Sequence, residues 1–195
     1  MNDGYRWDIF ISYRRTPRIR DWVHGVLLEE LRDWLPEQMS RDPRIFVDEK
    51  IEVGTPWPDE LEHGLKTSRT MLCVWSPTYF RSEWCKAEWA SMADREDQEA
   101  CRGSRPRILY PLLWQDGDLL PERARNTQYR DVKRWSHLRP EFRSSAQALA
   151  FTEEMQVVCQ ELATMISSAP SFRADFPIQR PVPSPTPPSD LPRLA

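Results

Sequence analysis

WDIFISYRR, residues 7–15, is the stretch of this chain that decides the fold. Residues 7–13 form a short apolar run rich in β-branched and aromatic side chains, which predicts a buried strand. Tyr13, Arg14 and Arg15 follow one another where this strand closes. The first element of the chain is therefore expected to be an interior strand with basic side chains at its end.

Working outward from this strand, residues 18–35 have helical spacing, with apolar side chains four residues apart from Val23 to Leu35. Pro36 is expected to end that helix, because proline has no backbone N–H to donate. The same kinds of pattern predict a strand at 44–48, a short helix at 61–67, a strand at 69–75, a helix from about 82 to 99, a strand at 107–114 containing Pro111, a fifth strand near 129–135, and a helix at 145–167.

Strands that alternate with helices predict an α/β domain with a parallel sheet and helices on both faces. Ligands of such sheets bind at the carboxyl ends of the strands, where the strand order reverses. Four side chains are expected near those ends, namely Tyr13, Asp48, Ser76 and Trp114. Any functional site is therefore predicted at this edge.

Composition narrows the class of protein. The 195 residues carry a net charge of −3, which gives no electrostatic case for nucleic-acid binding. The four cysteines form no CxxC pair and lie near no histidine at zinc-ligand spacing, so free thiols and no metal are expected. No apolar run approaches the roughly 20 residues that a membrane helix needs, and MNDGYRWD does not resemble a signal peptide. A cytoplasmic protein is expected.

The chain changes character near its end. Seven of the eighteen prolines lie between Pro177 and Pro192. A stretch such as PVPSPTPPSDLP is typical of extended polyproline II or of disorder. We expect a folded domain over residues 1–168 and a proline-rich tail over residues 169–195, which serves as a linker or as a ligand for a proline-binding partner.

The stretch SPTYFRSEWCKAEW, residues 76–89, follows the third predicted strand and opens a helix. Glu88 lies four residues after Trp84, so both side chains share one helix face. From spacing alone, Glu88 fits either a solvated helix carboxylate or a site residue. Trp84 fits either core packing or stacking on a ligand.

Three motifs together resemble the successive boxes of the Toll/interleukin-1 receptor (TIR) domain family. They are WDIFISYRR, RIFVDEKIEVGTPW and SPTYFRSEWCKAEW, in that order. The stretch YRDVKRWSH, residues 129–137, is also similar to the late part of the axonal NAD-cleaving TIR enzyme. The resemblance covers roughly residues 5–167 and implies a flavodoxin-like three-layer fold around five parallel strands.

The resemblance implies an NAD-cleaving enzyme of the bacterial type, with Glu88 as the catalytic glutamate. Other members of the family catalyse nothing and act as scaffolds through TIR–TIR contacts, and this alternative stays open. Trp84 matches the aromatic position one turn before the glutamate. The resemblance also places Tyr13 and Arg14 at the nucleotide, and Trp114 is a candidate wall of the pocket.

The segment from Asp48 to Trp57 matches the BB loop of the family, which guards the site and contacts a neighbouring TIR domain. Asp48 and Trp57 are candidate substrate contacts, and the assembly residues are Glu49, Lys50, Ile51 and Gly54. The resemblance therefore implies a homo-oligomer or filament in which self-association is coupled to activity.

The chemistry suits these residue types. Cleavage of the nicotinamide–ribose bond passes through an oxocarbenium-like sugar, which a nearby carboxylate can stabilise. NAD+ would be the substrate, and no cofactor is expected. Capture by water would give ADP-ribose, and capture within the same molecule would give a cyclic product. Loss of NAD+, or a signal made from it, would suit a role in bacterial antiviral defence.

Two other site classes find no support. The chain has six glycines and no GxGxxG motif, so a phosphate-cradling loop is not expected. A response regulator would share the fold but needs an acidic cluster after the first strand. His24, His63 and His137 are expected to lack convincing partners and to have surface or helix roles rather than catalytic ones.

Overall fold

A computed structural model describes residues 3–47, 59–116, 120–142 and 145–181. Five parallel strands form one sheet in the order β2-β1-β3-β4-β5, which is the flavodoxin-like order. The predicted fold class is thus confirmed. The strands are β1 (Trp7–Tyr13), β2 (Ile45–Val47), β3 (Ser68–Trp75), β4 (Leu109–Leu113) and β5 (Arg130–Asp131).

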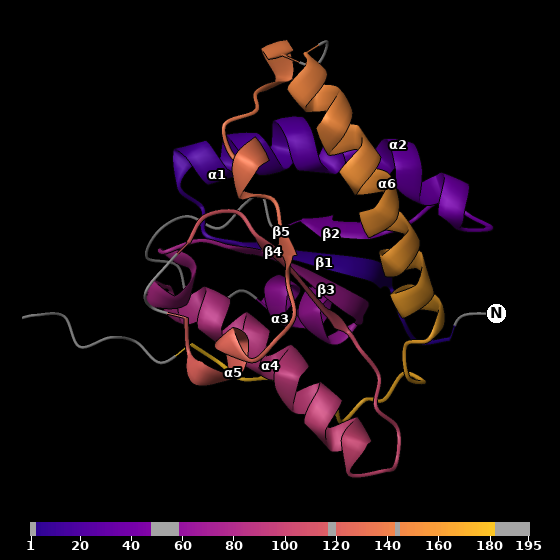
Figure 1. Cartoon of the computed structure of the whole chain (residues 1–195). Coiled ribbons are helices and arrows are strands. Elements are labelled where there is room, and N and C mark those ends of the chain that lie inside the picture. The colour runs from indigo at the N-terminus through magenta and orange to yellow at the C-terminus, as the bar shows by residue number, and fades with distance from the viewer. Residues whose placement is uncertain (1–2, 48–58, 117–119, 143–144, 182–195) are drawn as a thin grey trace, which may run out of the picture.

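Helices cover both faces of the sheet (Figure 1). One layer holds α1 (Pro17–Trp22), the π-helical turn η1 (Val23–Leu27), α2 (Leu28–Gln38) and α6 (Ala146–Ser167). The other holds α3 (Asp59–Lys66), α4 (Glu83–Ala100) and α5 (Glu122–Arg125). Short 3-10 turns are η2 (Tyr79–Arg81), η3 (Lys133–Trp135) and η4 (Pro140–Phe142).

The period of two along each strand divides the core into two clusters. Ile9 and Ile11 of β1 face the layer of α1, α2 and α6. Phe10 faces the opposite layer, where Leu65 of α3 and Met92 of α4 pack. Alternate residues of one strand therefore serve opposite faces, and this alternation also decides where the polar residues of β1 point.

Two predicted boundaries need correction. Pro36 was expected to end the first helix, but α2 continues to Gln38 with Pro36 inside it. Proline is tolerated here because it lies near the end of the helix, where its missing N–H costs one hydrogen bond and only two helical residues follow it. The predicted fifth strand near 129–135 shortens to β5, because the 3-10 turn η3 begins at Lys133.

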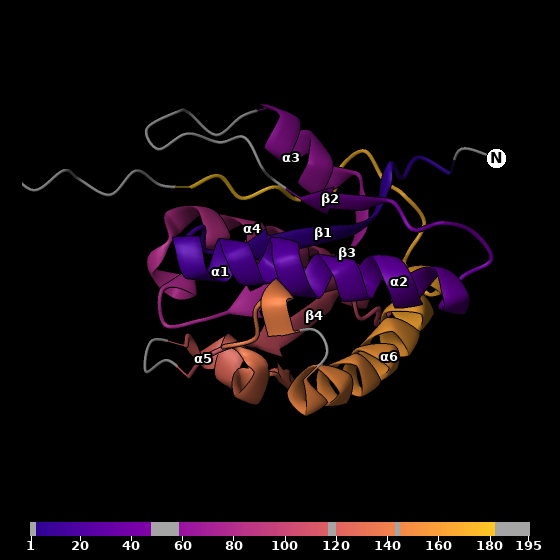
Figure 2. The ribbon, with the colours of Figure 1, turned by 90° about the horizontal axis from the view of Figure 1, so that it is seen from above.

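The packed chain does not end at residue 168, which corrects the predicted domain boundary. We call residues 169–180 the C-terminal strap. It passes between α3 and α4 in the view from above (Figure 2), and Phe176 is only 3% exposed. Phe176 stacks on Tyr5 and lies over the guanidinium of Arg95. The boundary was predicted too early because the proline-rich composition drew attention away from Phe176, an apolar side chain that packs on the domain. The predicted disorder of residues 182–195 concerns residues outside the described ranges.

Side-chain hydrogen bonds fix the far end of the strap. The backbone N–H of Gln179 donates to Ser91 Oγ at 2.8 Å, and its side-chain amide donates to Asp94 at 2.7 Å. Arg180 pairs with Glu62 of α3 at 2.9 Å. The strap thus connects the two helices of the α3 and α4 layer.

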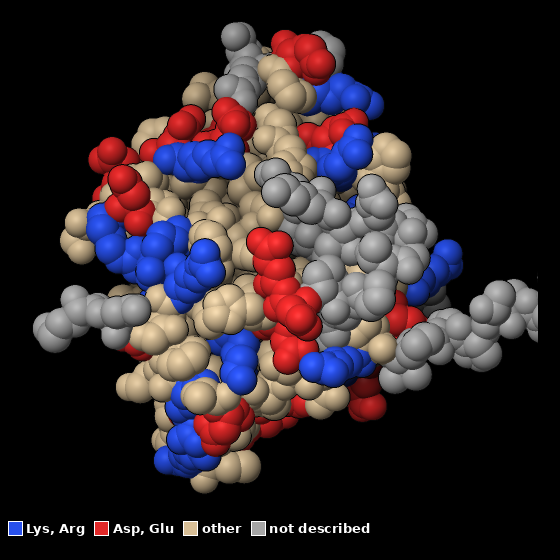
Figure 3. All heavy atoms as spheres, turned by 180° about the vertical axis from the view of Figure 1, so that it is seen from behind, with Lys and Arg blue, Asp and Glu red and all other residues tan. Residues whose placement is uncertain are grey.

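Acidic and basic side chains are interspersed over the face seen from behind (Figure 3). The charge of this face is therefore mixed in sign.

Candidate functional site

The carboxyl ends of β1 and β3 meet at the centre of the sheet. The two strands pair in register through Tyr13 and Val74, and the chain order reverses around them, as β2 lies on one side and β4 on the other. This is the switch point where ligands of open α/β sheets bind. The α4 helix begins above this edge, after β3 and the turn η2.

Ser12 and Tyr13 point to opposite faces here because they are neighbours on one strand. Tyr13 faces the α1 and α2 layer, where its hydroxyl lies 2.9 Å from His24 Nε2. Ser12 faces α4 and is 1% exposed. His24 therefore has a partner, which corrects the expectation that it would lack one.

Glu88 is turned inward from the second turn of α4 and is 7% exposed. Ser12 Oγ donates a hydrogen bond to Glu88 Oε2 at 2.6 Å, and the hydroxyl of Tyr79 lies 2.7 Å from the same Ser12 oxygen. Three residues that are distant in the sequence thus form one buried polar cluster. The reading of Glu88 as a solvated helix carboxylate does not hold.

Burial raises the pKa of the Glu88 carboxyl from its ordinary value of 4.5 to about 7. The hydrogen bond from Ser12 and the positive charge of Arg15 both oppose this rise. A carboxyl with a pKa near neutrality changes its charge within the working range of an enzyme. Strongly perturbed pKa values of this kind mark candidate functional sites.

The start of α4 is held to the end of β1 by Arg14. Ser82 caps the helix by accepting from the backbone N–H of Cys85 at 3.4 Å, and Arg14 donates to Ser82 Oγ at 3.2 Å. Arg14 is otherwise exposed. The predicted nucleotide contact thus lies at the helix N-terminus, where positive charge and free N–H groups gather.

The two candidate tryptophans are placed differently. Trp84 is half-buried and packs at the rim of the cluster around Phe10 and Trp75. Trp114 is 2% exposed and lies in the opposite core, edge-on to Trp22 and beneath the guanidinium of Arg18. The structure therefore places Trp114 in the interior, whereas Trp84 lies on the helix that carries Glu88.

The remaining candidates fall outside the described residues. They are Asp48 and Trp57, predicted to contact substrate, and Glu49, Lys50, Ile51 and Gly54, predicted to take part in assembly.

Ser12, Tyr79 and Arg15 were missed as site residues. The sequence held one usable signal for Ser12, since a polar side chain inside a buried strand requires a partner. Tyr79 and Arg15 gave no such signal, because their approach to Glu88 depends on how η2 and the end of β1 are placed.

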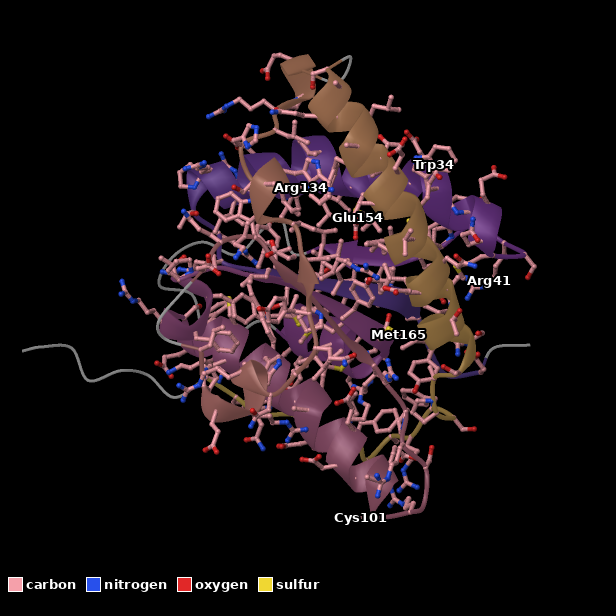
Figure 4. All side chains as sticks on the ribbon, viewed as in Figure 1. Trp34, Arg41, Cys101, Arg134, Glu154 and Met165 are labelled. Carbon is pink, nitrogen blue, oxygen red and sulfur yellow. The ribbon has the colours of Figure 1, made fainter. Side chains whose placement is uncertain are left out.

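A cavity of about 510 Å³ lies at the opposite, amino edge of the sheet. Arg41, beside the end of α2 in Figure 4, and Arg69 line it. Both are engaged by the buried carboxylate of Asp8. Burial would raise the pKa of Asp8, but hydrogen bonds from Arg41 and Arg44 bring it below its ordinary value. The two arginines that line this cavity are thus already paired with Asp8, and we favour the Glu88 edge as the site.

Within the described ranges, no three or more His, Cys, Asp or Glu side chains gather as a metal site would require. All four cysteines are free. The helices of the described chain are all too short or too polar to cross a membrane.

A sequence profile of the TIR domain family matches residues 9–149, which is most of the chain. The chain belongs to the TIR domain family. The match includes β1 from Ile9 onward and β2 to β5 of this TIR domain, together with Ser12, Tyr79 and Glu88.

Two solved structures are similar to this TIR domain. One is the TIR domain of the Toll-related receptor TRR-2 from Hydra magnipapillata, with 18% identity, a TM-score of 0.44, and coverage of 77% of this chain and 98% of that one. The other is the TIR domains of the activated Roq1 resistosome that recognises the effector XopQ, with 19% identity, a TM-score of 0.36, and coverage of 82% and 84%. A search of curated proteins finds no match.

Proposed function

We propose that this TIR domain cleaves the nicotinamide–ribose bond of NAD+, with Glu88 as the catalytic carboxylate. The observation that carries the proposal is the placement of Glu88 at the carboxyl edge of β1 and β3, buried and held by Ser12. A carboxylate with restricted hydration stabilises a developing sugar cation more strongly than one in water.

The two oxygens of Glu88 are not equivalent. Oε2 accepts from Ser12 at 2.6 Å, whereas Oε1 accepts no hydrogen bond from the residues that the structure describes. Oε1 therefore keeps its lone pairs for the ribose of a substrate. Arg14 and Arg15 at the end of β1 supply positive charge for the pyrophosphate.

Activity is expected to depend on self-association, with a neighbouring copy completing the site, and loss of NAD+ would then serve a defence or signalling role. The competing function is a TIR scaffold that binds partners and leaves NAD+ intact.

The test follows nicotinamide release by chromatography from the full chain at low and high protein concentration. Glu88→Gln keeps the shape of the side chain and removes its charge, so release should fall by about a hundredfold or more. Glu83→Gln is the matched control, because Glu83 lies on the same helix and pairs with Lys86 on its surface. That control should retain activity.

The pH profile gives a second readout. Because the ionised carboxylate stabilises the cation and its pKa is about 7, release should rise with pH and level off above neutrality. If the wild-type chain self-associates but releases no nicotinamide at any pH, the proposed NAD+ cleavage is wrong and the scaffold function is favoured.

A further inference from the structure

Two hydroxyl groups stand in line behind the carboxylate of Glu88. The phenol of Tyr79, from η2, lies 2.7 Å from Ser12 Oγ, and Ser12 Oγ lies 2.6 Å from Glu88 Oε2. Tyr79 is fully buried and Ser12 almost so. The three groups come from a turn, a strand and a helix, so their meeting is a product of the tertiary fold.

The direction of these hydrogen bonds follows from the number of available protons. A serine hydroxyl has one hydrogen to donate. When that hydrogen goes to an ionised Glu88, Ser12 has only lone pairs left for Tyr79, so Tyr79 must be the donor of the second bond. Burial raises the pKa of Tyr79 well above its ordinary value, so the phenol keeps the proton that it donates.

The other groups that influence Glu88 do not replace this support. Arg15 lies near the end of β1 and provides the positive charge. Cys73 of β3 and Cys85 of α4 are buried thiols whose pKa values are raised by desolvation, so both are neutral. Ser12 is therefore the hydrogen-bond donor to Glu88 among the described residues.

We propose that Ser12, supported by Tyr79, is a positioning residue that fixes the orientation of the Glu88 carboxylate and leaves Oε1 directed to substrate. The proposal rests on the proposed function and extends it to residues that do not themselves touch the reacting bond. A glutamate has three rotatable side-chain bonds, and a short hydrogen bond at its tip removes much of that freedom.

The test compares Ser12→Ala and Tyr79→Phe with the wild-type full chain, using pH profiles of nicotinamide release. The hydrogen bond from Ser12 stabilises the ionised form of Glu88 and so lowers its pKa. Its loss in Ser12→Ala should therefore move the midpoint of the pH profile up by about one to two pH units. Release at pH 7 should fall about tenfold or more. Tyr79→Phe should shift the midpoint in the same direction by less, because Ser12 can still donate.

Ser68→Ala is the matched control. Ser68 is also a fully buried strand serine, but its hydroxyl donates to the carbonyl of Gly64, far along β3 from the site. It should lower stability without moving the midpoint of the pH profile. Circular dichroism and unfolding curves establish whether each variant folds. If Ser12→Ala does not fold, the pH profile of Tyr79→Phe tests the proposal.

The outcomes separate the two proposals. A wild-type chain without nicotinamide release overturns both. The positioning role alone is overturned if the wild-type protein is active but the midpoint for Ser12→Ala equals that of wild type. The same holds if the Ser12→Ala midpoint moves no further than the Ser68→Ala midpoint.

Discussion

At the scale of single residues, Glu88 and Asp8 show how burial and partners set the charge of a carboxyl group. Asp8 is fully buried and engages Arg41, Arg44 and Arg69, and its pKa is lowered. Among the described residues, Glu88 accepts a hydrogen bond from Ser12 and feels the positive charge of Arg15, and burial raises its pKa to about 7. The first arrangement favours a permanent charge, whereas the second keeps the ionised form costly, as a reactive group requires.

The raised pKa of Glu88 predicts a measurable loss of stability with rising pH. The folded state holds the Glu88 proton more tightly than the unfolded chain, so the free energy of unfolding should fall between pH 4.5 and about 7. Converted at 1.36 kcal/mol per pKa unit, the full effect is on the order of 3 kcal/mol. Glu88→Gln should remove this slope and be more stable than wild type at pH 8.

Urea unfolding followed by tryptophan fluorescence at a series of pH values measures this slope. The titration of Asp8 does not interfere with the slope from Glu88. Because the pKa of Asp8 is lowered in the folded state, Asp8 stabilises the fold above pH 3.8, and this contribution is lost only as the pH falls below that value. Equal slopes for wild type and Glu88→Gln between pH 5 and 8 would show that Glu88 is not desolvated.

At the scale of elements, α3 docks on β2 through a close approach at Gly64. A Cβ atom at this position would lie 2.7–3.0 Å from the ring of Phe46, which itself stacks on Phe10. Glycine is therefore required here by space, although it lowers helix propensity. The same contact sets how closely α3 lies against the sheet.

Gly64→Ala should destabilise the domain by about 1–2 kcal/mol, since the clash outweighs the gain in helix propensity. The partner change Phe46→Leu supplies the control, because a smaller side chain leaves room for the new methyl group. In a double-mutant cycle, Gly64→Ala should cost less in the Phe46→Leu background. Additive effects of the two changes would contradict the proposed clash.

Periodicity was sufficient to predict most elements, and their alternation predicted the sheet. Glu88 was identified by resemblance and by its place after β3, but its burial was not predictable, because the side chains that enclose it come from β1 and η2. Ser12 was hidden by the apolar run around it. Local sequence pattern reports the period of an element, whereas the site depends on which elements are neighbours.

At the scale of the whole molecule, the C-terminal strap joins parts of the domain that the sheet alone does not connect. Phe176 covers the guanidinium of Arg95, which is fully buried and donates to the carbonyls of Ser68 and Leu65. Burial lowers the pKa of Arg95 to about 10. The strap thus shields a buried cation that ties α4 to the end of α3.

Truncation tests the extent of the folded unit. A chain ending at Pro181 should unfold at the same urea concentration as the full chain. A chain ending at Ser168 loses Phe176 and the other strap anchors and should be less stable by several kcal/mol, given about 1.5–3 kcal/mol per buried large apolar side chain. Equal stability of the two truncated chains would show that the strap contributes nothing.

The exposure of Cys101 has a practical consequence. It closes α4 at the end opposite to the turn that carries Glu88 (Figure 4), and the other three thiols are buried. A maleimide dye should therefore attach to the unmodified chain at one defined point, away from the carboxylate. Energy transfer between donor- and acceptor-labelled copies would then report association in the same cuvette in which nicotinamide appears.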